Sequence, residues 1–194
     1  MTAPAEGRIG PNALLQLVPV LEAAIGARLT AQLFAQAGVD RVPQDAMIAE
    51  GPVALVHQSI RARLPDRAPA LLRQAGLGTG DYILAHRIPK VAQRLLRLLP
   101  RRVAARLLAR AIARNAWTFA GSGQFRIVSV RPMVFEIADN PVVRGEVALH
   151  PICDWHVAVF ERLFAELTDP QATLTETACC ACGAPACRFV LHLR

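Results

Sequence analysis

The chain has 194 residues, 53% hydrophobic and 19% charged, which fits one globular domain with a substantial core. No stretch approaches the ~18 consecutive apolar residues of a membrane span, and the N-terminus lacks signal-peptide order, so we expect a cytoplasmic protein. The net charge of +7, with 21 Arg and a single Lys, favours anionic partners.

The N-terminal half carries the apolar periodicity of helices. We expect residues 1–10 to form a disordered lead. A helix is predicted over 11–37, where Pro19 requires either a kink or a later start. A second helix is predicted over 50–64 and a short third one over 66–75.

A glycine-rich segment, Gly76–Asp81, follows the short helix. It does not match the dinucleotide-binding fingerprint, and a helix precedes it rather than a strand. We therefore predict an ordinary connection between helices instead of a phosphate-binding loop.

Residues 89–115 predict a pair of helices broken at Pro100. Basic residues form two stripes at helical spacing: Lys90, Arg94, Arg97 and Arg101, then Arg102, Arg106, Arg110 and Arg114. The opposing face is apolar: Val91, Leu95, Leu98, Val103, Leu107 and Ala111. Residues 90–114 then form either a solvated outer face or a surface that docks on an anionic membrane or an acidic partner. Nucleic acid is disfavoured, because the nearby aromatic residues lie past the stripes.

The pattern changes after residue 120. Strands are predicted over 124–130 and 133–137, a helix from His150 to about 167, and a final hairpin that turns near Gly183. This order predicts an α+β fold, in which a helical N-terminal half packs on an antiparallel sheet built from a strand–strand–helix–strand–strand unit.

The final hairpin also carries the densest chemistry. Four of the five cysteines lie between positions 179 and 187, and the fifth, Cys153, lies at the start of the last predicted helix. In a reducing compartment such a cluster favours metal ligands or reactive thiols over disulfides.

Residues 120–194 resemble the 4-vinyl reductase domain, a small-molecule-binding module also found in bacterial sensors of aromatic compounds. In its phenol-sensing members, zinc is held by a Cys at a helix start, a Glu, and two Cys of a terminal hairpin. The matching residues here are Cys153, Glu176, Cys179 and Cys187. The resemblance implies a single domain of the 4-vinyl reductase type over 11–194, divided into a helical half, 11–119, and the signature, 120–194.

The implied metal is a structural zinc, because three thiolates and a carboxylate complete a tetrahedral set. Glu176 and Cys179 are three residues apart, so a bulge or turn is needed to bring them to one side of a strand. Two alternatives stay open: a set that uses Cys180 or Cys182, and thiols without a metal. An iron–sulfur cluster is less favoured than zinc.

Among family members, the chain resembles those of bacteriochlorophyll biosynthesis, which implies a Mg-tetrapyrrole ligand of the divinyl protochlorophyllide or chlorophyllide type. Candidates to ligate or line it are His57, His86, Trp117, Phe119, Phe125 and Trp155. Each is also a common type of core or surface residue. A carrier that delivers the pigment to biosynthetic enzymes is favoured over a vinyl reductase, so we assign no catalytic residue. The resemblance further implies a homodimer, and the role implies a peripheral place at the photosynthetic membrane.

Overall fold

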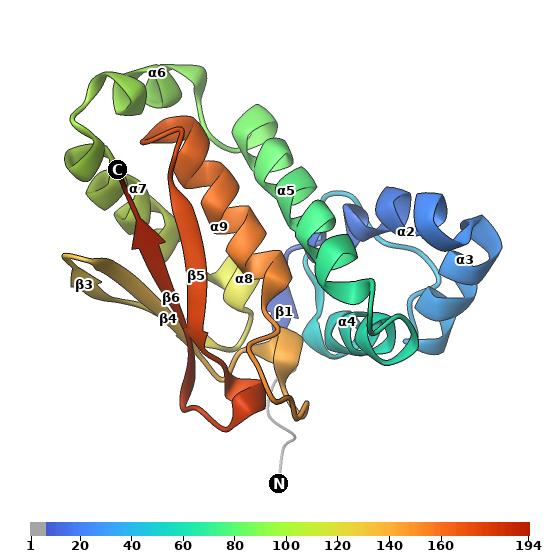
Figure 1. Ribbon diagram of the computed structural model, residues 1–194. Coiled ribbons are helices and arrows are strands. Elements are labelled where there is room, and N and C mark those ends of the chain that lie inside the picture. Colours follow the sequence, from blue (N-terminus) through green and yellow to red (C-terminus); the bar gives the residue numbers. More distant parts are fainter. Residues whose placement is uncertain (1–6) are drawn as a thin grey trace, which may run out of the picture.

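A four-stranded antiparallel sheet forms one side of the fold, in a computed structural model that describes residues 7–194 (Figure 1). β3 (Gln124–Val130) pairs with β4 (Met133–Ala138), and β5 (Thr173–Ala178) pairs with β6 (Ala186–His192). The two hairpins meet through β4 and β6, which gives the order β3-β4-β6-β5. Both predicted hairpins are confirmed, because alternating apolar and polar residues give the sheet one buried face.

The last helix of the chain lies on the buried face of the sheet. α9 (Asp154–Leu167) packs Phe160 and Phe164 on Phe135 of β4, with ring centroids 5.5 and 5.8 Å apart. The sequence predicted that this helix begins at His150, but it begins after Cys153. Two features explain the later start. Pro151 disfavours a helical backbone conformation at His150, the residue before it. The backbone amide of Cys153 donates a hydrogen bond to the Glu176 side chain of β5.

The glycine-rich segment lies inside a helix, so the predicted connection over 76–81 is wrong. α5 runs from Ala68 to His86 and packs along α9 (Figure 1). A Cβ at Gly76 would lie 2.5 Å from the Trp155 backbone oxygen, and one at Gly80 would lie 2.7 Å from Cβ of Arg162. These glycines are therefore required for the close approach of two helices, which overrides their poor helix propensity.

The N-terminal helices form a group beside α5 (Figure 1). The single helix predicted over 11–37 is divided into α1 (Asn12–Leu15), α2 (Leu17–Ile25) and α3 (Ala27–Gln36). Gly26, with φ of +84°, separates the last two. The helix predicted over 50–64 is confirmed as α4 (Glu50–Arg63).

Residues 7–10 are part of the folded structure. β1 (Arg8–Ile9) pairs with β2 (Ile48–Ala49), and Ile9 is fully buried. The lead predicted over 1–10 is therefore wrong for residues 7–10, whereas 1–6 lie outside the described residues. Two-residue strands are too short for their periodicity to be recognised.

The basic helices follow the predicted division at Pro100, as α6 (Lys90–Leu98) and α7 (Arg101–Arg114), before the short α8 (Trp117–Ala120). Short 3-10 turns, η1 (Pro141–Val143) and η2 (Cys180–Cys182), complete the elements. The α+β class with helices on an antiparallel sheet is confirmed. Within the described residues, no helix has both the length and the apolarity to cross a membrane.

Candidate metal centre

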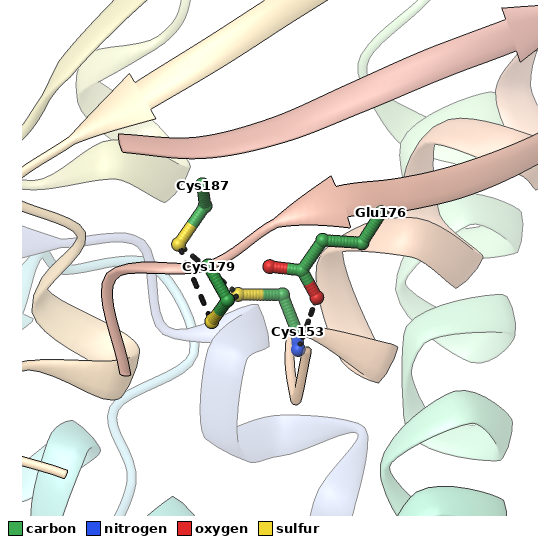
Figure 2. Close-up of side chains that lie close together, drawn as sticks. All are labelled: Cys153, Glu176, Cys179 and Cys187. Carbon is green, nitrogen blue, oxygen red and sulfur yellow. Dashed lines mark hydrogen bonds between the residues drawn. The ribbon is translucent and has the colours of Figure 1, made fainter. Parts of the chain in front are cut away.

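Three segments bring the predicted metal ligands together at one end of the sheet (Figure 2). Cys153 caps α9, Glu176 lies in β5, Cys179 follows that strand, and Cys187 lies in β6. One ligand atom from each of these side chains lies within 4.8 Å of the other three. The three thiols are buried and form no disulfide.

A bulge resolves the spacing of Glu176 and Cys179. The β5–β6 register shifts between Glu176 and Ala178, so one additional residue is accommodated in β5. A regular strand would direct residues three apart to opposite faces. The shift turns the Cys179 sulfur to the same side as the Glu176 carboxylate, as the sequence required.

The sulfur atoms have the separations of a tetrahedral site. The Sγ atom of Cys153 lies 3.4 Å from that of Cys187 and 3.9 Å from that of Cys179, and the remaining pair is 3.8 Å apart. A tetrahedral ion with Zn–S bonds of about 2.3 Å would place its sulfurs roughly 3.8 Å apart. A disulfide would require about 2.05 Å.

Neighbouring donors orient these ligands. The Cys153 amide donates to Glu176 Oε2 at 2.8 Å, and the Cys180 amide donates to Cys187 Sγ at 3.4 Å. Asn140 Nδ2 lies 3.4 and 3.5 Å from the sulfurs of Cys153 and Cys187. The sequence predicted only a loop at Asn140. Its position before a proline was a turn signal, but nothing in the sequence indicated a contact with sulfur.

The electrostatics of the cluster favour a bound cation. Burial raises the pKa of Glu176 to about 8 and raises the pKa of Cys153 well above its usual range. The thiols of Cys153 and Cys187 instead lower the pKa of Cys179. The buried Glu176 Oε1 atom has no hydrogen-bond partner within residues 7–194. A divalent cation would stabilise the ionised forms and give this oxygen a partner, so the donor set fits zinc.

The two other cysteines do not join the cluster. Cys180 directs its sulfur toward the Ile137 carbonyl oxygen, 3.9 Å away, and Cys182 is exposed. The geometry therefore disfavours an alternative set built on Cys179 and Cys182. A four-thiolate cluster is disfavoured for the same reason.

Four of the six predicted pigment-contacting residues lie along one aromatic run, in which His57 and Trp155 are buried and Phe119 and Phe125 are half-buried. Trp155 lies 5.9 Å from His57 and 4.8 Å from His156, measured between ring centroids. The ring centroid of His156 lies 6.4 Å from that of Phe119, which in turn lies 5.4 Å from that of Phe125. The structure thus connects residues of α4, α9, α8 and β3.

Two predicted residues lie apart from this run. His86 is exposed at the end of α5 beside Tyr82, and Trp117 is exposed at the start of α8. Two surface hollows, of about 320 and 330 Å³, contain none of the six predicted residues in their linings.

Comparison with known proteins places this geometry in a family. The 4-vinyl reductase domain matches residues 133–193. Over 185 residues the chain is 60% identical to the bacteriochlorophyll synthase 23 kDa chain of Cereibacter sphaeroides, covering 95% of this chain and 90% of that protein. This chain belongs to the family of bacteriochlorophyll synthase 23 kDa chains. A Rhodobacter capsulatus protein of the same name is 47% identical over 188 residues, covering 96% and 88%. The family predicted from the cysteine spacing is confirmed.

Two solved structures share the fold of this family member. The phenol-responsive sensory domain of the transcription activator PoxR, solved with phenol, has a TM-score of 0.54 at 16% identity and covers 74% of each chain. An H-NOX protein from S. oneidensis, in the Fe(II)NO ligation state, has a TM-score of 0.60 at 13% identity, covering 96% of this chain and 99% of that one. At these identities the likeness shows the fold alone.

Proposed function

We propose that this protein binds a Mg-tetrapyrrole intermediate of bacteriochlorophyll synthesis, of the divinyl protochlorophyllide or chlorophyllide type. It delivers the pigment to the biosynthetic enzymes for reduction of the C8-vinyl group. The observation that carries this proposal is the 60% identity to a bacteriochlorophyll synthase 23 kDa chain over nearly the whole length. The partners that this role implies are pigment enzymes and a membrane surface.

The aromatic run is the proposed pigment site. The Nε2 atom of His57 lies 3.0 Å from the Ala13 carbonyl oxygen, whereas its Nδ1 atom has no partner within residues 7–194. Burial lowers the pKa of His57 to about 3, so the ring is neutral and Nδ1 carries a free lone pair. A neutral imidazole is a suitable axial ligand for Mg. The neighbouring Trp155, and Phe119 farther along the run beside His156, offer flat apolar surfaces for a macrocycle. Because His57 and Trp155 are buried, binding requires α4 and α9 to separate locally.

An absorbance titration with a divinyl Mg-tetrapyrrole tests the proposal. We expect a saturable shift of the Soret band without consumption of the vinyl group. His57→Gln removes the shift, whereas His86→Gln, at an exposed histidine, retains it. Circular dichroism establishes that each variant is folded.

Three results would contradict this assignment. An unshifted band with the folded wild-type protein excludes pigment binding. A shift that His57→Gln leaves intact moves the site away from the aromatic run. Vinyl reduction by the purified protein with NADPH alone supports the second candidate, a reductase that takes electrons from a soluble cofactor.

We also propose that the cysteine–glutamate cluster binds one structural zinc ion. Its four protein ligands would leave no position for water or substrate, so the ion would fasten the β5–β6 hairpin to α9 rather than act in catalysis. The three thiols within 3.9 Å of one another and the unpaired Glu176 oxygen support this role.

A further inference from the structure

The polarity of α6 is reversed relative to an ordinary surface helix. Val91, Leu95 and Leu98 are 76%, 57% and 84% exposed, whereas Gln93 is buried. Gln93 donates to the carbonyl oxygen of Ile88 at 2.8 Å and also to that of Leu84, which fixes the α5–α6 turn. Gln93 and the half-buried Leu96 therefore face the protein, whereas Val91, Leu95 and Leu98 face solvent.

The exposed aliphatic residues form a stripe rather than scattered positions. Val91, Leu95 and Leu98 follow the i, i+4, i+7 spacing of one helix face. In α7, Val103 and Leu107 have the same spacing and are 41% and 42% exposed. Single exposed apolar residues are ordinary, but aligned residues within each of two consecutive helices indicate a contact surface.

Cations border this aliphatic stripe. Six of them form no ion pair or side-chain hydrogen bond within residues 7–194: Lys90, Arg94, Arg102, Arg106, Arg110 and Arg114. Arg97 and Arg101 instead contact Glu166 and Asp169 and hold the two helices to the rest of the fold. No acidic residue occurs in the sequence between Asp81 and Glu136. The surface therefore combines apolar contact with an unneutralised positive field.

This chemistry selects one kind of partner. A second copy that packed through the same face would bring two sets of free cations together, which is unfavourable. A purely apolar partner would leave the cations without counter-charges. We propose that α6 and α7 dock the protein on an anionic lipid surface, with Val91, Leu95 and Leu98 inserted among the headgroups and the arginines on lipid phosphates.

This inference names the membrane partner of the proposed function, but its test requires no pigment. Failure of vesicle binding leaves the Soret titration untouched, and failure of the titration leaves vesicle binding untouched. The two proposals are therefore distinguishable.

Vesicle flotation tests the surface. We expect wild-type protein to float with vesicles that contain phosphatidylglycerol and much less with phosphatidylcholine alone, with binding reduced by added salt. Leu95→Gln/Leu98→Gln lowers the partition coefficient by about tenfold or more, because the inserted apolar area is lost. Arg106→Gln/Arg110→Gln lowers it by roughly tenfold or more on anionic vesicles only.

The matched control is Val147→Gln/Leu149→Gln, at two fully exposed apolar residues before α9. This variant should float like the wild-type protein. Absent flotation of wild-type protein with anionic vesicles overturns the proposal, as does equal loss in the control variant. Sedimentation velocity distinguishes self-association: a dimer that Leu95→Gln/Leu98→Gln dissociates, without lipid binding, would assign this face to a second copy.

Discussion

α9 and α6 are both amphipathic helices, but the apolar stripe of α9 is buried and that of α6 is exposed to solvent. α9 buries its stripe between the sheet and α5, where Phe160 and Phe164 are at most 1% exposed. α6 buries only Gln93 fully and leaves Leu95 and Leu98 in solvent. The difference lies in the neighbours, because the sheet and α5 cover the apolar stripe of α9, whereas no element within residues 7–194 covers Val91, Leu95 and Leu98 of α6.

The comparison shows that an amphipathic stripe specifies a contact without specifying which molecule provides it. Periodicity gives the direction of an apolar face relative to its own helix axis. The rotation of that helix against the core depends on distant contacts, such as the Gln93 bonds to the end of α5. For α6 these contacts turn the stripe outward.

The largest effect is expected at the cysteine–glutamate cluster, which anchors the start of α9. Cys187→Ser should reduce zinc content from about one ion per chain to near none and lower the free energy of unfolding by about 5 kcal/mol. Metal analysis and urea denaturation measure both. Cys182→Ser, at an exposed cysteine outside the cluster, should change neither quantity. A Cys187→Ser protein with full zinc content would refute the ligand set.

The buried stripe of α9 should show the next largest effect. Phe164 is fully buried and stacks on Phe135 at 5.8 Å between ring centroids. Phe164→Ala removes these contacts and leaves a cavity, so we expect about 4 kcal/mol of destabilisation in urea denaturation. A loss below about 1 kcal/mol would mean that α9 is not the central helix of the core.

The α5–α9 contact gives a smaller effect with an internal control. Gly76→Ala places a Cβ against backbone of α9, and we expect a loss of about 2 kcal/mol. Gly78→Ala meets only the flexible Gln16 side chain, so improved helix propensity should stabilise by up to about 1 kcal/mol. Equal changes in thermal denaturation of the two variants would contradict the close approach of the helices.

The outward stripe of α6 should show the smallest effect. Leu95→Gln replaces a side chain that is 57% exposed, so the free energy of unfolding should change by less than about 0.5 kcal/mol. A loss comparable to that of Phe164→Ala in urea denaturation would show that the stripe is buried in solution, and the contrast between the two helices would disappear.

Local signals in the sequence predicted the sheet, and the family resemblance implied the four residues that the structure brings together in the cysteine–glutamate cluster. Alternation marked β3 and β4, and the spacing of Cys153, Glu176, Cys179 and Cys187 identified the family. Long-range contacts escaped prediction. The role of Gly76 depends on Trp155, which is distant in the sequence. The glycine-rich composition of residues 76–81 is by itself typical of a loop.

The pigment residues show the same limit. The sequence marked His57 and Trp155 as candidates but could not show that they touch each other or that His86 and Trp117 lie elsewhere. Pigment ligation by these residues and the homodimer stay predictions. Tertiary packing decides which aromatic residues meet, and no short-range pattern encodes it.

The bulge in β5 determines how many residues separate Glu176 from Cys179 in the sequence. Along a regular strand, a carboxylate and a thiolate on one face would be two residues apart. The additional residue between Glu176 and Ala178 lengthens this interval to the observed three. We therefore expect a deletion at this point to be tolerated only if the bulge is lost, and an insertion only if a bulge is gained. A relative with a straight β5 should carry its Glu and Cys two positions apart.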